Sequence, residues 1–268
     1  MAHLFIFGLG YSAKRIASMA RERGLSVSAT GSAGDVDFAD RDAVRAELAK
    51  ATHVLSSVPP EEGGDPVLEA YGDALGGEWL GYLSSTGVYG DARGAWVDES
   101  AVVVGKGGGT GRRTARSACD AQWLARGARV FRLPGIYGPG RSAIERVRED
   151  KAHLIDLPKQ VFSRVHVEDI ASAVIAALDA PPGPYNIADD LPAPQNEVIE
   201  EACRLIGVRP PPLQSLDEAG LSPAARAFYA ENRRVANGKA KRMLGWQPRY
   251  PTYREGLRGL LSGAGGGT

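Results

Sequence analysis

The chain has 268 residues, 43% of them hydrophobic, and carries 32 basic and 32 acidic side chains. This length suits one large α/β domain, or one domain with a small appendage. A formal net charge of zero gives no overall attraction to nucleic acid or to an anionic membrane, and no apolar run approaches the roughly 20 residues of a membrane-spanning helix. We therefore expect neither nucleic acid nor a membrane among the partners.

The amino terminus and the cysteines indicate a cytoplasmic protein. MAHLFIFGLG lacks a basic leader and a cleavage site, which is expected of a mature protein and not of a signal peptide. Cys119 and Cys203 lie far apart in helix-like segments, as is typical of buried thiols in a reducing compartment. The four histidines show no metal-site spacing, so we expect no bound metal.

The first 180 residues alternate short apolar segments with helical patterns. We predict strands at residues 4–7, 27–29, 52–57, 80–85 and 129–133. We predict helices at residues 13–24, 41–50, 66–75 and 115–127. Strands that alternate with helices form βαβ units, and right-handed crossovers between them give a parallel sheet covered on both faces.

The pattern changes after residue 180. PPGP (181–184) ends the preceding helical pattern, and RPPPL (209–213) makes a second stiff break. The remaining segments favour short helices at 195–206, 222–230, 238–244 and 253–261. We therefore predict a Rossmann-type, doubly wound parallel α/β sheet over residues 1–180. A smaller, mainly helical lobe follows over residues 181–268.

A glycine motif joins the first strand to the first helix. In LFIFGLGYSA, Gly8, Gly10 and Ala13 form a GxGxxA arrangement. Gly8 permits the tight turn, Gly10 lets backbone amides approach a pyrophosphate, and Ala13 lets the helix pack on the strand. Because the strand, the helix and the βαβ alternation agree with this motif, the sequence predicts a dinucleotide site. The loop GKGGGTG (105–111) resembles a phosphate loop only in composition, and we assign it no phosphate.

The turn after the second strand bears on the choice between NAD and NADP. An NAD site usually has an Asp or Glu at the end of this strand. Here Thr30, Gly31 and Ser32 occupy the turn, and Asp35 lies beyond it. The missing carboxylate leaves room for a 2′-phosphate with Ser32 as a donor, although no arginine stands beside it. The sequence thus favours NADP and leaves NAD open.

Several further stretches resemble the extended short-chain dehydrogenase/reductase superfamily, the NAD-dependent epimerase/dehydratase group. They are SSTGVYGD (84–91), RLPGIYGPGRS (132–142), FSRVHVEDIASAV (162–174), YNIADD (185–190) and NGKAKRMLGWQPRYPTYREGL (237–257). Their order and spacing span almost the whole chain. The stretches DARGAWVDES and GIYGPGR are most similar to the YeeZ-like, nucleoside-diphosphate-sugar epimerase-like branch. The resemblance implies hydride transfer at a nicotinamide, with residues 1–180 binding NAD(P) and residues 181–268 binding the substrate.

The resemblance also implies roles for individual residues. Ser85 matches the catalytic hydroxyl, Thr86 matches the next position, which some members use as an acid, and Tyr137 is a further catalytic candidate. The substrate cleft, which draws some residues from 134–166, would include Tyr89, Arg141, Arg164 and His166. The cofactor would contact Gly8, Gly10, Tyr11, Ser12, Ala13, Ser32, Ser57, Val58, Ser84, Pro134, Gly135 and Ile136.

The proton relay of the superfamily is missing from this chain. The resemblance implies a Tyr-x-x-x-Lys pair, in which the tyrosine exchanges the proton of an alcohol and the lysine lowers the pKa of the tyrosine. In GRRTARSACDAQW (111–123), Thr114 falls near the place of the tyrosine and Ala118 near that of the lysine. A threonine hydroxyl cannot act as the acid–base that a phenol is.

Three interpretations remain open. An enzyme could use a relocated acid–base, for which Tyr89, Tyr137 and His166 are candidates. Positive charge for a ribose or a phosphate would then come from Arg112, Arg113 or Arg116. The chain could instead be an inactive NAD(P)-binding sensor or regulatory protein, or a scaffold that acts through a protein partner. We expect an oxidoreductase or epimerase-like enzyme that acts on an unidentified small molecule, for example a nucleotide sugar, as a monomer or homodimer.

Overall fold

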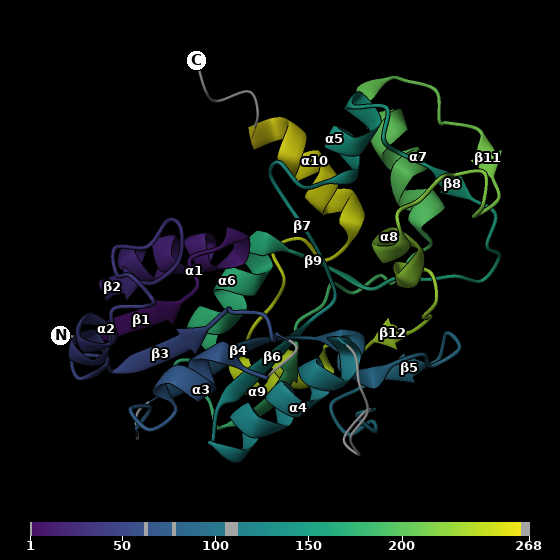
Figure 1. The fold of residues 1–268 in the computed structure, drawn as a ribbon. Helices are drawn as coiled ribbons and strands as arrows, with labels where there is room; N and C mark the ends of the chain where they lie inside the picture. The colour runs from purple at the N-terminus through teal and green to yellow at the C-terminus, as the bar shows by residue number, and fades with distance from the viewer. Residues whose placement is uncertain (1, 62–63, 77–78, 105–111, 264–268) are drawn as a thin grey trace.

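The computed structural model describes residues 2–61, 64–76, 79–104 and 112–263 (Figure 1). Its centre is a parallel sheet of β1 (His3–Phe7), β2 (Ser26–Ala29), β3 (His53–Ser56), β4 (Trp79–Ser85), β6 (Arg129–Leu133) and β10 (Gly183–Asn186). The strands lie in the order β10-β6-β4-β3-β1-β2. The order reverses at β1, because β2 pairs with one side of it and β3 with the other. This sheet confirms the predicted doubly wound fold class.

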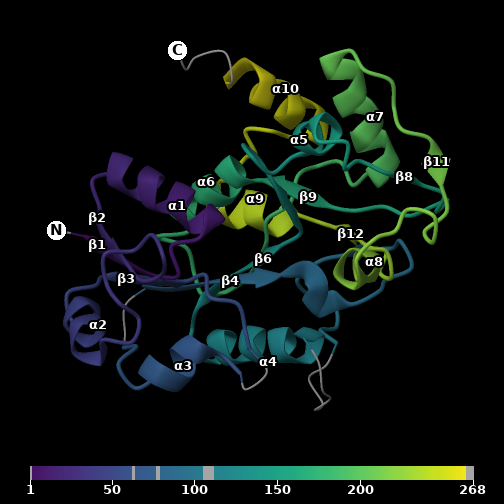
Figure 2. The ribbon, with the colours of Figure 1, turned by 45° about the horizontal axis from the view of Figure 1, so that its top comes forward.

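Helices cover both faces of the sheet (Figure 2). One face carries α1 (Tyr11–Glu22), α6 (Val167–Ala176) and α9 (Gly238–Leu244), and the other carries α2 (Arg41–Leu48), α3 (Pro66–Tyr71) and α4 (Arg112–Ala125). The first core lies between the sheet and α1, α6 and α9, and the second core lies between the sheet and α2, α3 and α4. Because side chains alternate along a strand, Ile6 packs in the first core and Phe5 packs in the second. Within the described ranges, no helix is long and apolar enough to span a bilayer.

Asp65 sets the start of α3. Asp65 accepts hydrogen bonds from the backbone N–H groups of Val67 and Leu68 at 2.9 and 3.1 Å, with Pro66 in the first turn of α3, a combination that favours helix initiation. The same carboxylate accepts a bond from the indole of Trp123 in α4 at 2.6 Å. Asp65 therefore both caps α3 and holds α4 against it.

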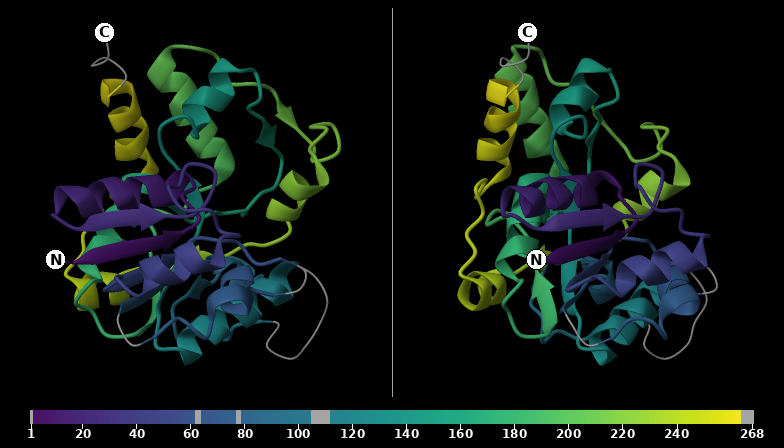
Figure 3. Two further views of the ribbon diagram at one scale, coloured as in Figure 1. Left: turned by 60° about the vertical axis from the view of Figure 1, so that its left-hand side comes forward. Right: turned by 90° about the vertical axis from the view of Figure 1, so that its left-hand side faces the viewer.

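The remaining elements form a lobe at one edge of the sheet (Figure 3). The lobe has its own core and contains α5 (Ala143–Arg148), β8 (Leu154–Ile155), α7 (Gln195–Ile206), β11 (Leu213–Gln214), α8 (Pro223–Phe228) and α10 (Tyr253–Gly263). Two short parallel pairs connect it to the sheet. They are β7 (Gly135–Tyr137) with β9 (Arg164–His166), and β5 (Trp96–Val97) with β12 (Arg234–Val235). A short 3-10 helix, η1 (Thr86–Tyr89), follows β4.

The predicted boundary at residue 180 needs adjustment. Strand β10 lies beyond it, yet pairs with β6 and completes the sheet. Helix α9 also packs on the sheet, against α6 and β10. We therefore propose that the second lobe segment, after the one that contains α5 and β8, begins after Asn186, that α9 belongs to the sheet domain, and that α10 returns to the lobe. The predicted loop 105–111 lies outside the described residues.

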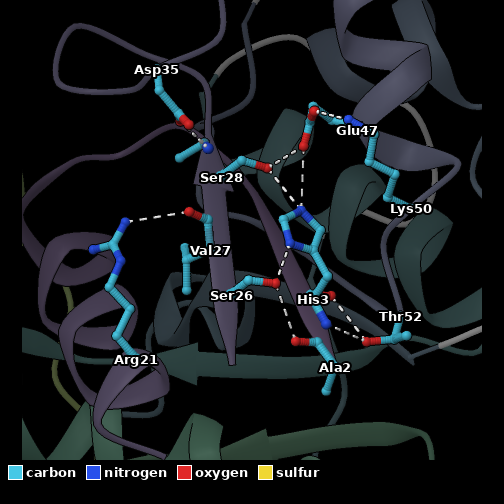
Figure 4. A network of polar contacts seen from close by, with 11 residues as sticks. Ala2, His3, Arg21, Ser26, Val27, Ser28, Asp35, Glu47, Lys50 and Thr52 are labelled. Atoms are coloured by element: carbon cyan, nitrogen blue, oxygen red, sulfur yellow. Dashed lines mark hydrogen bonds and ion pairs between the residues drawn. The ribbon is translucent and has the colours of Figure 1, made fainter. Parts of the chain in front are cut away.

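A polar network joins the beginnings of β1 and β2 to the last turn of α2 (Figure 4). The two ring nitrogens of His3 lie 2.8 Å from Ser26 Oγ and 2.9 Å from Ser28 Oγ. Ser28 Oγ donates to Glu47 Oε2 at 2.9 Å, and Lys50 pairs with the same carboxylate. Because His3 begins β1 and the glycine motif follows its other end, this network stabilises the sheet edge far from that motif.

Candidate cofactor and substrate site

Four neighbouring strands end side by side at one edge of the sheet. Phe7 at the end of β1 lies opposite Ser56 of β3, and Ser85 at the end of β4 lies opposite Leu133 of β6. The residues that follow these strands are Gly8, Ser57, Thr86 and Pro134. In open α/β sheets, ligands bind beyond the carboxyl ends of the strands, where the strand order reverses. This edge is therefore the expected place of the site.

The glycine motif has a shape that fits a pyrophosphate. Gly8 has a φ of +83°, and a Cβ there would lie 3.1 Å from Val58 Cγ2 and 3.2 Å from Ser57 Oγ, so the turn itself requires glycine. Gly10 is different, because its φ is −85° and a Cβ would meet nothing within 4 Å. It precedes α1 with no side-chain cap. The space beside Gly10 and the uncapped helix start fit a dinucleotide pyrophosphate.

The turn after β2 packs against this motif. Thr30 is buried, and its hydroxyl and carbonyl oxygens accept bonds from Gly8 N at 3.1 Å and Leu9 N at 2.8 Å. Asp35 Oδ1 accepts a bond from Ala29 N at 2.7 Å, so it is turned back towards β2. Ser32 remains an exposed hydroxyl at this turn.

A cavity of about 340 Å³ opens at the end of β4. Ser85 and Thr86 line it, together with Arg116 from α4. Ser85 Oγ accepts a bond from Gly87 N at 3.1 Å, which leaves its own proton free to be donated. Arg116 makes no hydrogen bond or ion pair with the residues that the structure describes. No tyrosine, histidine or lysine is found among the described residues that line this cavity. The side chains of Arg112, Arg113 and Thr114 lie outside the described part of the chain.

A larger cavity of about 620 Å³ adjoins the Ser85 cavity on the lobe side. The two cavities share Pro134, Gly135, Phe162, Ser163 and Phe228. Ile136, Tyr137, Arg141 and Arg164 also line the larger one. The cleft between sheet and lobe thus has two chambers that meet at Gly135.

A buried polar network below the Ser85 cavity was not anticipated from the sequence. Arg132 at the end of β6 and Asp120 of α4 form an ion pair at 2.7 Å, with side chains only 3% and 1% exposed. Ser84 Oγ donates to Asp120 at 2.7 Å. Arg132 also donates to the Tyr89 hydroxyl at 3.0 Å, which in turn donates to Asn186 at 2.8 Å. A charged residue just before the end of an apolar strand, as Arg132 is in RVFRL, was the available signal.

This network corrects two expectations. Ser84 was expected to contact the cofactor, but it is 5% exposed and its hydroxyl is directed at Asp120. Tyr89 was expected to face the substrate, but it is 4% exposed. Burial raises the pKa of the Tyr89 hydroxyl, and the nearby Arg132 charge opposes that rise. Both side chains serve the network and do not line either cavity.

Tyr137 and His166 lie against each other beneath the larger cavity, with ring centroids 5.1 Å apart. The Tyr137 hydroxyl is buried without a partner among the described residues, and burial raises its pKa. His166 is 2% exposed and caps α6 by accepting a bond from Glu168 N at 3.2 Å. Burial lowers the pKa of His166 to about 4. His166 is therefore a neutral capping residue and does not face the cleft as expected.

Arg141 and Tyr11 connect the glycine motif with the larger cavity. The Tyr11 hydroxyl donates to Pro139 O at 3.0 Å, and the Arg141 guanidinium lies 5.8 Å from the Tyr11 ring centroid. Ser12 is partly buried in the first turn of α1, while Ala13 is 1% exposed in the core. Arg141 thus lies beside both predicted ligand sites.

Comparisons with known proteins agree with this geometry. No family model matches the chain. Two curated relatives are "3-diazoavenalumate denitrifying reductase" of a Streptomyces species, 31% identical over 48% of this chain, and protein YeeZ of Escherichia coli, 28% identical over 63% of it. These matches span 45% and 58% of the respective relatives, about half of their length.

Two solved structures match nearly the whole chain. A conserved protein of unknown function from Silicibacter pomeroyi DSS is 38% identical, with a TM-score of 0.85, and the match covers 98% of this chain and 99% of that one. The human epimerase family protein SDR39U1, solved with NADPH, is 15% identical with a TM-score of 0.77, and the match covers 97% and 99%. The fold expected from the resemblance to the extended short-chain dehydrogenase/reductases is confirmed, and the similarity to protein YeeZ agrees with the expected branch. The chain therefore belongs to one family with the Silicibacter pomeroyi protein, and that family has the fold of the NAD-dependent epimerase/dehydratase superfamily.

Proposed function

We propose that the chain is an oxidoreductase that binds NADPH, or with lower affinity NADH, and reduces a small substrate in the Ser85 cavity. One observation carries this proposal. The open space beside Gly10 and the cavity lined by Ser85 and Thr86 lie at the same edge of the sheet. Matched structures solved with NADPH or with NAD support a nicotinamide cofactor.

The chain's own residues would hold and polarise the substrate. The nicotinamide supplies a hydride when the cofactor is bound. The hydroxyls of Ser85 and Thr86 donate hydrogen bonds to a substrate oxygen at the end of β4. The Arg116 guanidinium lines the same cavity and stabilises negative charge that develops on that oxygen.

The cavity favours reduction over epimerisation. An epimerase that oxidises an alcohol needs a base for the hydroxyl proton. The described residues that line the Ser85 cavity include no tyrosine, histidine or lysine, and their one carboxylate, Glu231, is paired with Arg233. An electron-poor acceptor that is already polarised can accept a hydride without simultaneous proton transfer. The similarity to a relative named as a reductase supports this choice.

Cofactor titration is the first test. We expect NADPH to bind the cofactor-stripped protein with a lower Kd than NADH, because no carboxylate occupies the turn at Ser32. Ser32→Asp should reverse this preference, since a carboxylate repels a 2′-phosphate and accepts bonds from a ribose. Absence of binding by both cofactors in calorimetry would refute the proposed function.

Turnover is the second test. Substrate-dependent loss of the reduced-nicotinamide absorbance should fall in Ser85→Ala, with unchanged NADPH affinity. Ser262→Ala, at the exposed end of α10, is the matched control. Cofactor binding without turnover on a broad panel of carbonyl and diazo compounds would instead favour the sensor interpretation.

A further inference from the structure

Arg164 is a buried cation without an ionic partner. Arg164 is only 6% exposed. Nη1 donates to Phe162 O and Ala193 O at 2.9 and 3.0 Å, and Nη2 donates to Gln195 Oε1 at 3.2 Å. All of these acceptors are neutral, and Arg164 forms no ion pair with any residue in the described ranges. Arg132, the other buried arginine of the site, differs because its guanidinium lies 2.7 Å from the Asp120 carboxylate.

A buried charge without a counter-charge is costly to the folded protein. Asp189 is the acid whose charge acts most strongly on Arg164, but the two residues form no ion pair, and the buried carboxylate oxygens of Asp189 make no side-chain hydrogen bond with the described residues. Burial raises the pKa of Asp189 to about 8, and the charge of Arg164 opposes that rise. Among the described residues, the Arg164 guanidinium therefore has no carboxylate in direct contact with it.

Arg164 lies in the wall of the larger cavity. Glu145 and Glu149 line the same cavity, but each has another partner. Glu145 accepts a bond from Ser142 Oγ, and Glu149 pairs with Lys151 at 2.8 Å. Two further arginines, Arg141 and Arg146, also line the cavity. The cavity thus carries a positive wall whose acidic residues are already engaged.

Other groups near Arg164 suit an anion as well. Helix α7 spans Gln195–Ile206 and begins at the cavity, and its N-cap residue Pro194 provides no side-chain cap. The start of a helix attracts negative charge. Tyr137 lines the cavity too, is 8% exposed, and has a hydroxyl with no partner among the described residues. An anion would thus find several donors besides the guanidinium.

An aromatic wall separates the two chambers. The rings of Phe162 and Phe228 stack with centroids 5.2 Å apart and planes at 22°, and Tyr229 meets Phe162 edge-on at 5.5 Å. Phe228 is 57% exposed although it lines both cavities. A planar ring can therefore stack on Phe228 from the cleft.

We propose that the larger cavity binds an anionic ligand with a planar ring, whose carboxylate or phosphate lies on Arg164 and Gln195. The ring stacks on Phe228, and the reactive end extends past Gly135 to Ser85. This inference rests on the proposed function for the role of Ser85, but the anion site itself does not depend on it.

Two anions with neutral counterparts test the proposal on the NADPH-saturated protein. Uridine diphosphate is compared with uridine, and cinnamate with cinnamamide, by isothermal titration. We expect one of the anions to bind about 10- to 100-fold more tightly than its neutral counterpart, as hydrogen bonds to a charged group imply. Which anion binds distinguishes a nucleoside diphosphate from an aromatic carboxylate.

Variants locate the site. Arg164→Gln should lower anion affinity by a similar factor, Arg164→Lys should lower it less, and the exposed control Arg209→Gln should leave it unchanged. Equal affinity for anion and neutral compound in the wild-type protein, or no binding of either anion, would overturn the proposal even if Arg164→Gln does not fold. If NADPH fails to bind, the proposed function falls, and the same titrations on the cofactor-free protein still decide the anion site.

Discussion

Replacement of Asp120 by Asn should reveal how strongly the buried network supports the site. Asp120 and Arg132 are joined by two hydrogen bonds, from Nε to Oδ1 at 3.1 Å and from Nη2 to Oδ2 at 2.7 Å. Asparagine keeps the size of the side chain but removes the negative charge. Arg132, with a side chain 3% exposed, would then be a buried cation without a counter-charge.

The expected loss of stability is large. Removal of one partner from a buried ion pair costs about 3–5 kcal/mol. In a chain of this size each kcal/mol lowers the melting temperature by roughly 2–4 °C, so we expect a fall of about 10 °C. Thermal unfolding followed by circular dichroism measures it. Asp73→Asn is the control, because the Arg45–Asp73 pair is exposed and should not change the melting temperature measurably.

A paired replacement separates charge from packing. Asp120→Leu combined with Arg132→Met removes both charges, and should be less destabilising than Asp120→Asn alone because no unpaired charge remains. The reasoning about this ion pair is wrong if Asp120→Asn has the same melting temperature as Asp73→Asn. It is also wrong if the double variant melts at a lower temperature than Asp120→Asn.

Three further changes address the glycine motif and the buried cluster beneath the lobe. Gly10→Ala should lower the melting temperature only slightly, because its Cβ enters open space at the N-cap of α1, but should weaken NADPH binding in a calorimetric titration by about tenfold or more, since it occupies the place of a pyrophosphate. Tyr137→Phe should keep or slightly raise stability to urea, because it removes a buried hydroxyl without a partner; a loss would indicate a partner for that hydroxyl. Burial raises the folded-state pKa of Asp189 from its ordinary 3.8 to about 8, so the folded protein binds the additional proton between these values. Its stability should fall as pH rises through that window. Asp189→Asn should lose less stability than wild type between about pH 5 and pH 8 in urea titrations, and a parallel pH dependence would contradict the raised pKa.

The fold could be predicted because its signals are local and repeated. Strand β6 and helices α7 and α9 have the predicted bounds, 129–133, 195–206 and 238–244. Helix α1 begins two residues earlier than predicted, at Tyr11, because Gly10 is its N-cap. The short pairs β5–β12 and β7–β9 were not predicted, because two or three residues cannot show a periodicity.

The candidate site was only partly predictable, because its polar contacts are long-range. Asp120 and Arg132 meet across a helix and a strand, and the sequence gives no reason to pair them. Arg164 was expected in the cleft from the resemblance, but its lack of an ionic partner depends on the whole surroundings of the side chain. His166 illustrates the opposite error, since a motif position near a cleft proved to be a helix cap.

The two serines at the end of β4 show where the sequence could have been used further. Side chains alternate across a strand, and Tyr82 packs in the second core while Leu83 contacts the first. Ser84 therefore shares the face of Tyr82, towards α4, and Ser85 shares that of Leu83. We predict opposite consequences for the two. Ser84→Ala should lower the free energy of unfolding by about 1–3 kcal/mol, because it removes a hydrogen bond to the buried Asp120 carboxylate, and should leave NADPH affinity unchanged. Ser85→Ala should lower that free energy less, because it removes only the bond from Gly87 N, and should lower turnover. Urea unfolding and the reduced-nicotinamide assay on both variants separate the roles, and a variant pair with the effects exchanged would mean that the catalytic hydroxyl had been assigned to the wrong face of β4.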